Sequence, residues 1–187
     1  MVQTNNASSE TQLVVFDLAS EYYGVDIGDV REIIRMQNVT RVPGTPSYME
    51  GVINLRGKVV PVVDLRKRLS LKVRAQTNDS RIVVVDIGGK DVGVIVDGVT
   101  EVLRIPLASV EPPSQMIASG DATYIRGIAK LADKLVILLD LDRVLSGSEY
   151  DIPIDLKSAE SDVVKDAKKQ EPPPVRSDKQ PAMAGAA

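Results

Sequence analysis

The sequence predicts a mainly β protein made of two similar modules, each a small barrel of about five short strands with little helix. The first observation behind this is an internal repeat: residues 13–36 recur without a gap as residues 82–105, and residues 48–69 recur as residues 124–145. The second is a series of short aliphatic runs bounded by Gly, Pro, Asn or Asp, which is typical of strands. The third is the prolines in the connections, which discourage long helices.

The repeat is specific, because its identical positions include glycines, tyrosines and charged residues at constant offsets. Chance similarity between two valine-rich strands would not match such residues across two separate blocks. A duplication explains them and predicts two modules of one design. The matches that matter most below are Gly24/Gly93, Val30/Val99, Glu32/Glu101, Tyr48/Tyr124, Gly51/Gly127, Lys58/Lys134 and Asp64/Asp140.

Eight aliphatic runs are expected to form strands, and a five-stranded antiparallel sheet of this size hides its edges best by curling into a barrel. Tight hairpins are expected at Gly88-Gly89 and at Arg56-Gly57, because glycine supplies the positive φ that such turns need, and Ala19-Ser20-Glu21 occupies the equivalent place in the first copy. The expected strands are residues 13–18, 22–27, 52–55, 58–65, 81–87, 91–96, 127–131 and 134–141.

Little helix is expected. Val30, Ile33 and Ile34 lie at helical spacing, as do their counterparts in the copy, which predicts a short helix or turn after each second strand. Residues 64–71 and 140–145 are expected to end each module with a brief helical segment.

The composition also divides the chain along its length. Residues 1–11 are small and polar and are expected to be a disordered lead-in. Residues 12–150 form the folded domain, with one module at about 12–75 and the other at about 80–148, and exchange of strands between the modules is left open. Residues 151–187 contain three consecutive prolines and many charges, and are expected to be a flexible, solvated tail.

Composition excludes several classes of function. The chain has no Cys and no His, which removes disulfides, thiolate nucleophiles, Cys-rich zinc sites and the commonest general base. A net charge of −3, no Trp and one Phe argue against a nucleic-acid partner, which would need a basic face and rings for stacking. No aliphatic run approaches the length of a membrane span and no signal-peptide core begins the chain, so we expect a cytoplasmic protein without membrane insertion.

Carboxylates are the remaining candidates for chemistry, and their pattern favours structural roles. Asp17 and Asp86 each precede a hairpin, where a carboxylate accepts local N–H bonds. Asp64 and Asp140 are paired copies after strands and are expected to cap or pair structurally. Gly88-Gly89-Lys90 lacks the spacing of a phosphate-binding loop and opens a strand. We therefore expect no enzyme, no metal site and no cofactor.

The most informative mismatch between the copies lies at one hairpin. The first copy has Asn54-Leu55-Arg56-Gly57 where the second has Lys130-Leu131-Ala132-Asp133. If the two modules share a backbone, the barrel does not require Arg56. Arginine at a hairpin tip offers a donor fork that suits a carboxylate of a partner. An ordinary solvated charge is the equally weighted alternative.

These residues resemble those of the CheW-type chemotaxis coupling proteins. The pattern TP-x-x-x-x-G-V-x-N-L-R-G-x-[VI]-[VI]-P-[VI]-[VI]-D-L-R is matched continuously from Thr45 to Arg66, and the resemblance covers about Gln12 to Leu145. It implies two SH3-like β-barrels packed around a hydrophobic core and groove. That architecture agrees with the two modules predicted from the repeat.

The resemblance further implies a non-catalytic adaptor, monomeric when isolated. Such a protein bridges the cytoplasmic tip of methyl-accepting chemoreceptors to the regulatory domain of the CheA-type histidine kinase, and is recruited to membrane-associated receptor arrays. It gives no assignment of single residues to receptor or kinase. The positions that it implies in partner binding are Val30, Glu32, Gly51, Asn54, Arg56, Gly57, Gly93 and Val102.

Two other functions stay open at this point. The first is a CheW-like coupler that serves a chemosensory pathway controlling something other than motility. The second belongs to a different class, a double-barrel module that binds a small ligand or nucleic acid and has an accessory role to an enzyme. Complex formation with receptor and kinase fragments discriminates between the adaptor and the second alternative.

Overall fold

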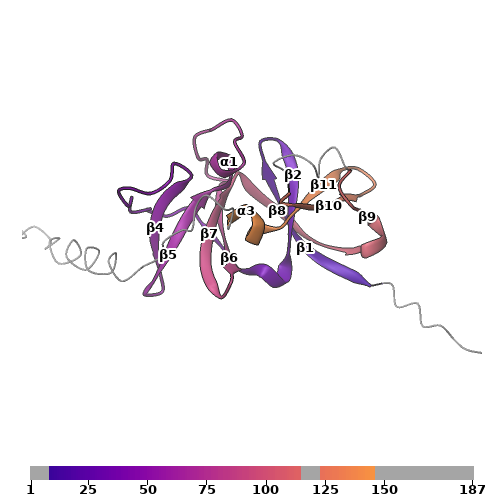
Figure 1. Ribbon diagram of the computed structural model, residues 1–187, viewed down its shortest axis with the longest axis horizontal. Helices are drawn as coiled ribbons and strands as arrows, with labels where there is room; N and C mark the ends of the chain where they lie inside the picture. The colour runs from indigo at the N-terminus through magenta and orange to yellow at the C-terminus, as the bar shows by residue number, and fades with distance from the viewer. Residues whose placement is uncertain (1–8, 115–122, 146–187) are drawn as a thin grey trace, which may run out of the picture. The chain divides into compact units, whose positions relative to one another are not determined.

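The computed structural model describes residues 9–114 and 123–145, whose strands form two sheets (Figure 1). We call the sheet of order β8-β1-β2-β11-β10-β9 barrel A and the sheet of order β3-β6-β7-β5-β4 barrel B. The mainly β prediction is confirmed, and the expected tail lies outside the described residues. The strands are β1 Glu10–Leu18, β2 Glu21–Asp26, β3 Val30–Arg35, β4 Met49–Leu55, β5 Lys58–Asp64, β6 Arg81–Ile87, β7 Lys90–Val96, β8 Gly98–Pro106, β9 Val110–Glu111, β10 Ile125–Lys130 and β11 Leu135–Leu139.

Each barrel is assembled from both repeats. Barrel A takes β1 and β2 from the first repeat and all its other strands from the second, whereas barrel B takes β6 and β7 from the second repeat and the rest from the first. Strands of one repeat pair antiparallel within their hairpins. Between the repeats, β1 pairs with β8 and β3 with β6 in antiparallel fashion, whereas β11 pairs with β2 and β5 with β7 in parallel. Neither repeat therefore forms a complete barrel from its own strands.

The third strand of each repeat carries the chain from one edge of its sheet to the other. In barrel A, β8 pairs with β1 at one edge, a 3-10 turn (η2, Leu107–Ser109) follows, and β9 pairs with β10 at the opposite edge. In barrel B, β3 pairs with β6, and Thr40 a few residues later bridges Val52 on β4. This path closes both sheets, so neither leaves a long unpaired edge.

Two matched glycines make that closure possible. A Cβ on Gly51 would lie 2.1 Å from the carbonyl oxygen of Thr40, and a Cβ on Gly127 would lie 2.8 Å from that of Glu111. Both carbonyls belong to the segment that closes the respective barrel. Gly51 also has a φ of +143°, which side chains other than glycine rarely adopt. The repeat thus keeps glycine where two backbones approach too closely for any side chain.

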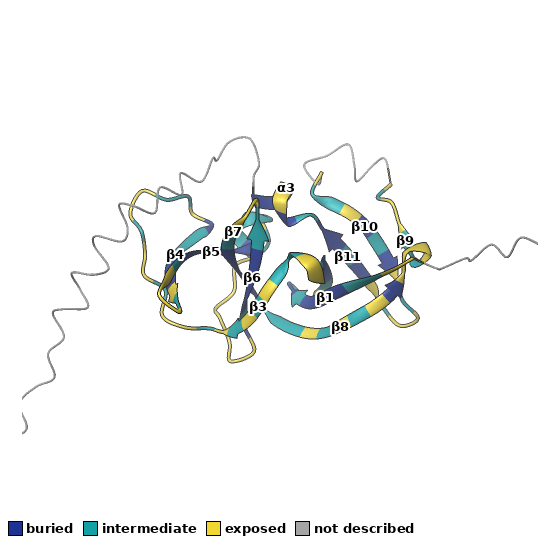
Figure 2. Ribbon diagram, turned by 90° about the horizontal axis from the view of Figure 1, so that it is seen from below, coloured by how far each residue is buried: buried dark blue, intermediate teal, exposed yellow. Residues whose placement is uncertain are grey.

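Three hydrophobic clusters hold the strands. One fills barrel A around Val15 and Val136, one fills barrel B around Val62 and Val84, and the largest joins the outer faces of both sheets around Phe16. Successive residues of the central strands therefore face two different cores, and Figure 2 shows these strands mostly in the colour of buried residues. This arrangement explains why their sequences are continuous aliphatic runs instead of alternating apolar and polar residues.

The helical expectation for residues 30–36 and their copy is wrong. Both segments are strands, β3 and β8, and only a 3-10 turn (η1, Ile27–Asp29) follows β2. Residues of β3 alternate between partly buried and exposed, because one face packs on the barrel and the other meets solvent. Val30 and Ile34 lie on the partly buried face of the strand, and Ile33 lies on the exposed face. Because Ile33 is also aliphatic, the three residues together have the spacing of a helix.

The expected helical endings are confirmed as α1 (Leu65–Arg68) and α3 (Leu141–Leu145). Asp64 caps α1 by accepting the N–H of Arg66 at 2.8 Å, and Asp140 accepts the N–H of Arg143 at 3.1 Å, as predicted. The turn role of Asp86 is also confirmed, since its carboxylate accepts the N–H of Gly89 at 2.7 Å.

The predicted turn role of Asp17 is wrong. Its carboxylate accepts the hydroxyl of Thr100 on β8, at 3.2 Å. The N–H of Ala19 in the neighbouring hairpin is taken by Asp97 instead, at 2.9 Å, because the crossing from β7 to β8 brings that carboxylate to the turn.

Asp97 ties the two barrels together at the crossing from β7 to β8. The guanidinium of Arg66, which is buried on α1 beside barrel B, donates to both carboxylate oxygens of Asp97, with Nε at 2.7 Å from Oδ1. The same carboxylate accepts the N–H of Ala19 in barrel A. Burial alone would raise the pKa of Asp97, but these hydrogen bonds outweigh it and hold the pKa below its usual value of 3.8.

We expect Gly51→Ala to lower the free energy of unfolding by about 3 kcal/mol or more, because the new Cβ displaces the segment that closes barrel B. Urea denaturation measures the change. Gly44→Ala is the matched control, since Gly44 also has a positive φ but has no atom within 4 Å of its would-be Cβ. The control should lose only about 1 kcal/mol. Equal losses in the two variants would contradict the close-approach explanation.

We expect Asp97→Asn to cost about 2 kcal/mol at neutral pH, a value reduced for the partial exposure of the pair. Because folding lowers the pKa of Asp97, its contribution is complete above the unfolded pKa and is lost as pH falls through the folded value. The difference in unfolding free energy between the parent chain and the variant should therefore shrink below about pH 4. Asp133→Asn, at an exposed hairpin position, is the control. A difference independent of pH would argue against this ion pair as its source.

Candidate functional site

The hairpin between β4 and β5 turns through Arg56 and Gly57, both with positive φ, 54° and 84°. The carboxamide oxygen of Asn54 accepts the N–H of Gly57 at 2.8 Å and fixes the turn. Left-handed backbone is easy for glycine but costs other residues about 1 kcal/mol. An arginine kept in this conformation points to a role for its side chain.

Arg56 in the β4–β5 hairpin and Glu32 on β3 form an ion pair where these two parts of barrel B meet. The Nη2 atom of Arg56 lies 2.9 Å from Oε2 of Glu32 on β3, although the two residues are 24 positions apart. The arginine side chain is 80% exposed and the glutamate side chain only 25%. The pair therefore presents its cation to solvent and keeps its carboxylate against the barrel.

Two further ion pairs repeat this arrangement around a hollow of about 440 Å³ at the same end of barrel B. Arg31 on β3 pairs with Asp86, and Lys58 pairs with Asp91 at 3.9 Å. In each pair the cation is more exposed than the carboxylate. We call this set of three pairs the rim of barrel B. Its outward charge is positive although the chain as a whole is acidic.

Barrel A carries the corresponding glutamate with a different partner. Glu101 pairs with Lys134, which lies over the ring of Tyr22 at 4.8 Å and is 15% exposed. The hydrogen bond from Lys134 to Glu101 raises the pKa of that lysine. Ala132 occupies the position of Arg56 in this barrel. The glutamate is thus shared by both repeats, but at this hairpin position only barrel B has an arginine.

The structure brings some of the predicted site residues together and separates others. Glu32, Asn54, Arg56 and Gly57 meet at the rim of barrel B. Val30 begins the same strand as Glu32 and packs partly buried against the core between the sheets.

The other three predicted residues lie elsewhere. Gly51 is buried at the closure of barrel B, and Gly93 is buried on β7, where a Cβ would lie 2.8 Å from Ile82. Each glycine can influence the surface only through the packing of its strand. Val102 is 52% exposed on β8 of barrel A, away from the rim.

Sequence reasoning missed the other cations of the rim. Arg31 and Lys58 have no distinguishing pattern, and Lys58 matches Lys134, which suggests scaffold as readily as function. The sequence indicates this region only through the mismatch at Arg56. That Arg31 and Lys58 lie near Arg56 follows only from the position of β3 beside the β4–β5 hairpin.

Two other kinds of feature are absent from the described residues. Within residues 9–114 and 123–145, Asp and Glu side chains form no group of three that could hold a metal ion. No helix in these ranges has the length and apolar character to cross a membrane. What the rim offers is exposed guanidinium and ammonium groups that can donate hydrogen bonds to a carboxylate.

Comparison with known proteins places this geometry in a family. The profile of the CheW-like domain matches residues 12–149. A chemotaxis protein CheW of Klebsiella aerogenes is 33% identical over 138 residues, covering 74% of this chain and 83% of the relative. One of Helicobacter pylori is 36% identical over 135 residues, covering 72% and 81%.

A solved structure agrees. The scaffolding protein TtCheW of Thermoanaerobacter tengcongensis superposes with a TM-score of 0.72 at 41% identity, covering 78% of this chain and 99% of that structure. The chain belongs to the CheW-like family, and its fold is the pair of SH3-like barrels that the resemblance implied.

Proposed function

We propose that this chain is a non-catalytic adaptor that couples methyl-accepting chemoreceptors to a CheA-type histidine kinase, in the cytoplasm and at membrane-associated arrays. Membership of the CheW-like family supports the adaptor role. The rim of barrel B supports the location of a partner contact, with Arg56 as its centre. Val30, Glu32, Asn54 and Gly57 shape that contact.

The single observation that carries the proposal is the exposed guanidinium of Arg56 on a hairpin whose copy in barrel A has alanine. Because the copy folds without it, the barrel does not need this arginine. Because the residue is held in left-handed backbone and braced by Glu32, its fork is positioned before any partner arrives. A prepositioned cation loses less conformational entropy on binding than a free one.

The ion pair between Arg56 and Glu32 can also be replaced by one between Arg56 and a partner. A surface pair contributes between about 0 and 1 kcal/mol to stability, so a partner carboxylate can displace Glu32 from Arg56 at little cost to the fold. The displaced glutamate then faces solvent or a partner cation. Such charges set register and partner choice more than raw affinity.

A coupler for a pathway other than motility uses the same contacts and differs only in which receptors bind. The double-barrel ligand-binding module has less support, since the rim hollow is lined mainly by paired charges and not by the apolar surface typical of small-ligand sites.

We expect Arg56→Glu to weaken the ternary complex with a receptor signalling fragment and the kinase regulatory domain by at least about tenfold, through like-charge repulsion. Sedimentation or pull-down measures the complex. Arg41→Glu, an exposed arginine outside the rim, is the control with the same change of charge. Urea denaturation should show both variants folding with nearly the parent stability.

A charge-swapped double variant, Glu32→Arg with Arg56→Glu, separates the two roles of the pair. It restores the internal ion pair but reverses the charge that faces a partner. We expect binding to stay weak. Recovery of binding in the swapped variant would assign Arg56 to the fold, and no complex with the parent chain at micromolar concentrations would remove the adaptor proposal itself.

A further inference from the structure

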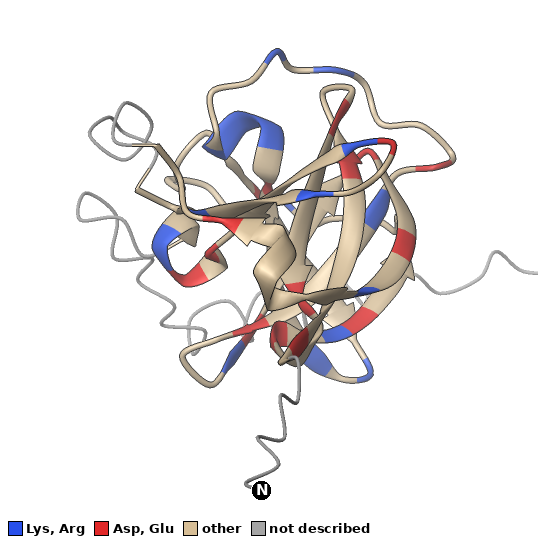
Figure 3. Ribbon diagram, turned by 90° about the vertical axis from the view of Figure 1, so that its right-hand side faces the viewer, with Lys and Arg blue, Asp and Glu red and all other residues tan. Residues whose placement is uncertain are grey.

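A second surface of barrel B carries more basic residues than its internal ion pairs use. Between Leu65 and Arg74 the chain has five basic residues and no acidic one, in a protein whose net charge is −3. In Figure 3 the short helix α1 near the top is mostly coloured as Lys and Arg. This segment follows β5, whereas the β4–β5 hairpin precedes it. Since β5 has seven residues, the segment lies roughly 20 Å from the rim.

Two of these five cations are neutralised within the molecule. Arg66 is buried against Asp97, and Lys67 pairs with Glu50. The other three are Arg68, Lys72 and Arg74, and none of them lies within 4 Å of a carboxylate of residues 9–114 and 123–145, although Arg74 points toward the carboxylate of Asp97. We call these three residues, together with Val73 between two of them, the basic surface.

Local packing holds the basic surface in place. The N–H of Leu71 donates to the carbonyl of Arg66 at 2.8 Å, and the Nη1 of Arg66 donates to the carbonyl of Lys72 at 2.6 Å. The connection after α1 is thereby fastened to the buried Arg66–Asp97 pair. Lys72 and Arg74 are exposed, and Val73 is 59% exposed between them.

Arg68 provides an independent sign of an absent partner. Its guanidinium lies 5.4 Å from the centre of the Tyr48 ring, and its Nε–H is buried but has no acceptor among the residues that the structure describes. Buried donors are nearly always paired in folded proteins. In barrel A the matching residue is Val144, which is buried in the core between the sheets. The fold therefore accepts an apolar residue at this position.

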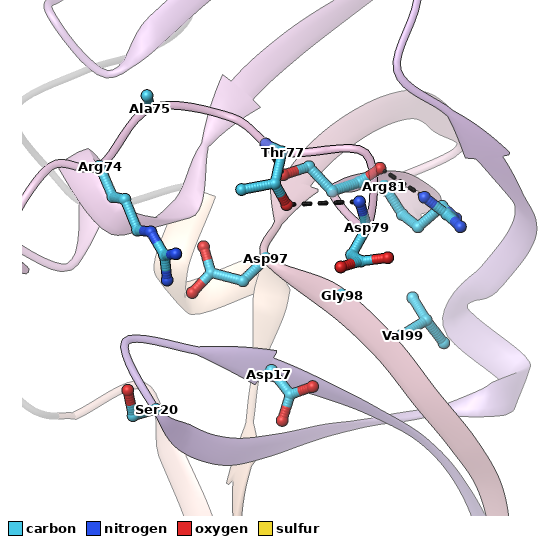
Figure 4. Close-up of a pocket in the computed structure, with 11 residues that line it drawn as sticks. Asp17, Ser20, Arg74, Ala75, Thr77, Asp79, Arg81, Asp97, Gly98 and Val99 are labelled. Carbon is cyan, nitrogen blue, oxygen red and sulfur yellow. Dashed lines mark hydrogen bonds between the residues drawn. The ribbon is translucent and has the colours of Figure 1, made fainter.

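The hollow beside this segment is a weaker candidate. It measures about 500 Å³, and Figure 4 shows Arg74 pointing toward Asp97, with Asp17, Asp79 and Arg81 also in the lining. Its lining has three carboxylates and two guanidiniums, so it does not favour an anionic ligand. The net positive charge lies on the outer side, over α1 and Lys72.

We propose that the basic surface is a second docking site, which binds an acidic polypeptide segment of a partner protein, with carboxylates on the cations and an aliphatic side chain on Val73. An acidic peptide fits better than nucleic acid, because the ring that the structure describes beside this surface, that of Tyr48, is buried and covered by Arg68. The site lies at the opposite end of β5 from the rim. Both surfaces can therefore be occupied at the same time.

The test measures fluorescence anisotropy of a labelled peptide of alternating glutamate and valine. We expect Lys72→Glu with Arg74→Glu to weaken its binding by at least about tenfold, and the control Arg41→Glu with Lys90→Glu, which has the same change of charge at exposed sites, by less than about threefold. Arg68→Val, which introduces the residue of barrel A, should weaken binding while the chain keeps its cooperative unfolding. Val73→Ser should do the same to a smaller extent.

Four results would overturn the proposal. The first is an equal loss of peptide binding in the test and control variants, and the second is equally tight binding of a peptide with glutamine in place of glutamate. The third is stronger binding of a single-stranded oligonucleotide of the same charge. The fourth is a self-association of the parent chain, seen by sedimentation, that the test variants lose, because a second copy of the chain would then be the occupant. Because Arg56 is unchanged in all these variants, failure here leaves the adaptor proposal standing.

Discussion

The constraint on which the rest of the structure depends is the exchange of strands between the two repeats. The β1–β2 hairpin of the first repeat completes its sheet only with strands of the second, and the β6–β7 hairpin of the second completes its sheet only with strands of the first. Each central strand then faces two cores, one inside its barrel and one between the sheets. The closing glycines and the buried Arg66–Asp97 pair lie at the points that this interlocking path creates.

A scaffold fixed in this way leaves only its turns and closing strands free to differ between barrels. Both barrels keep a glutamate on the closing strand, but barrel A binds it with a half-buried lysine and barrel B with an exposed arginine on a strained turn. The same divergence appears after the fifth strand, where barrel A has Val144 in the core and barrel B has Arg68 on the surface. Differences between two copies of one fold thus identify residues that the fold does not need, and these gather at both ends of β5.

The sequence predicted the β class, the duplication, the hairpins and the helical endings, because turn residues and aliphatic runs act locally. It did not predict β3 and β8. Ile33 is aliphatic although its face is exposed, so the alternation of apolar and polar residues that marks a strand was not visible. The partners of each strand depend on packing between distant segments, which no local pattern records. Asp97 was overlooked because it has no counterpart in the first repeat, and Gly51 and Gly93 were predicted as contact residues although both are buried for reasons of packing.

The central claim is that a partner binds the rim of barrel B and not its counterpart in barrel A. The most direct test follows backbone amide resonances of the whole chain while a receptor signalling fragment or the kinase regulatory domain is added. Shifts should gather at Glu32, Arg56 and Gly57 for at least one of these partners, with little change at Ala132 and Lys134. Shifts confined to the β10–β11 hairpin, or spread evenly over both barrels, would contradict the account.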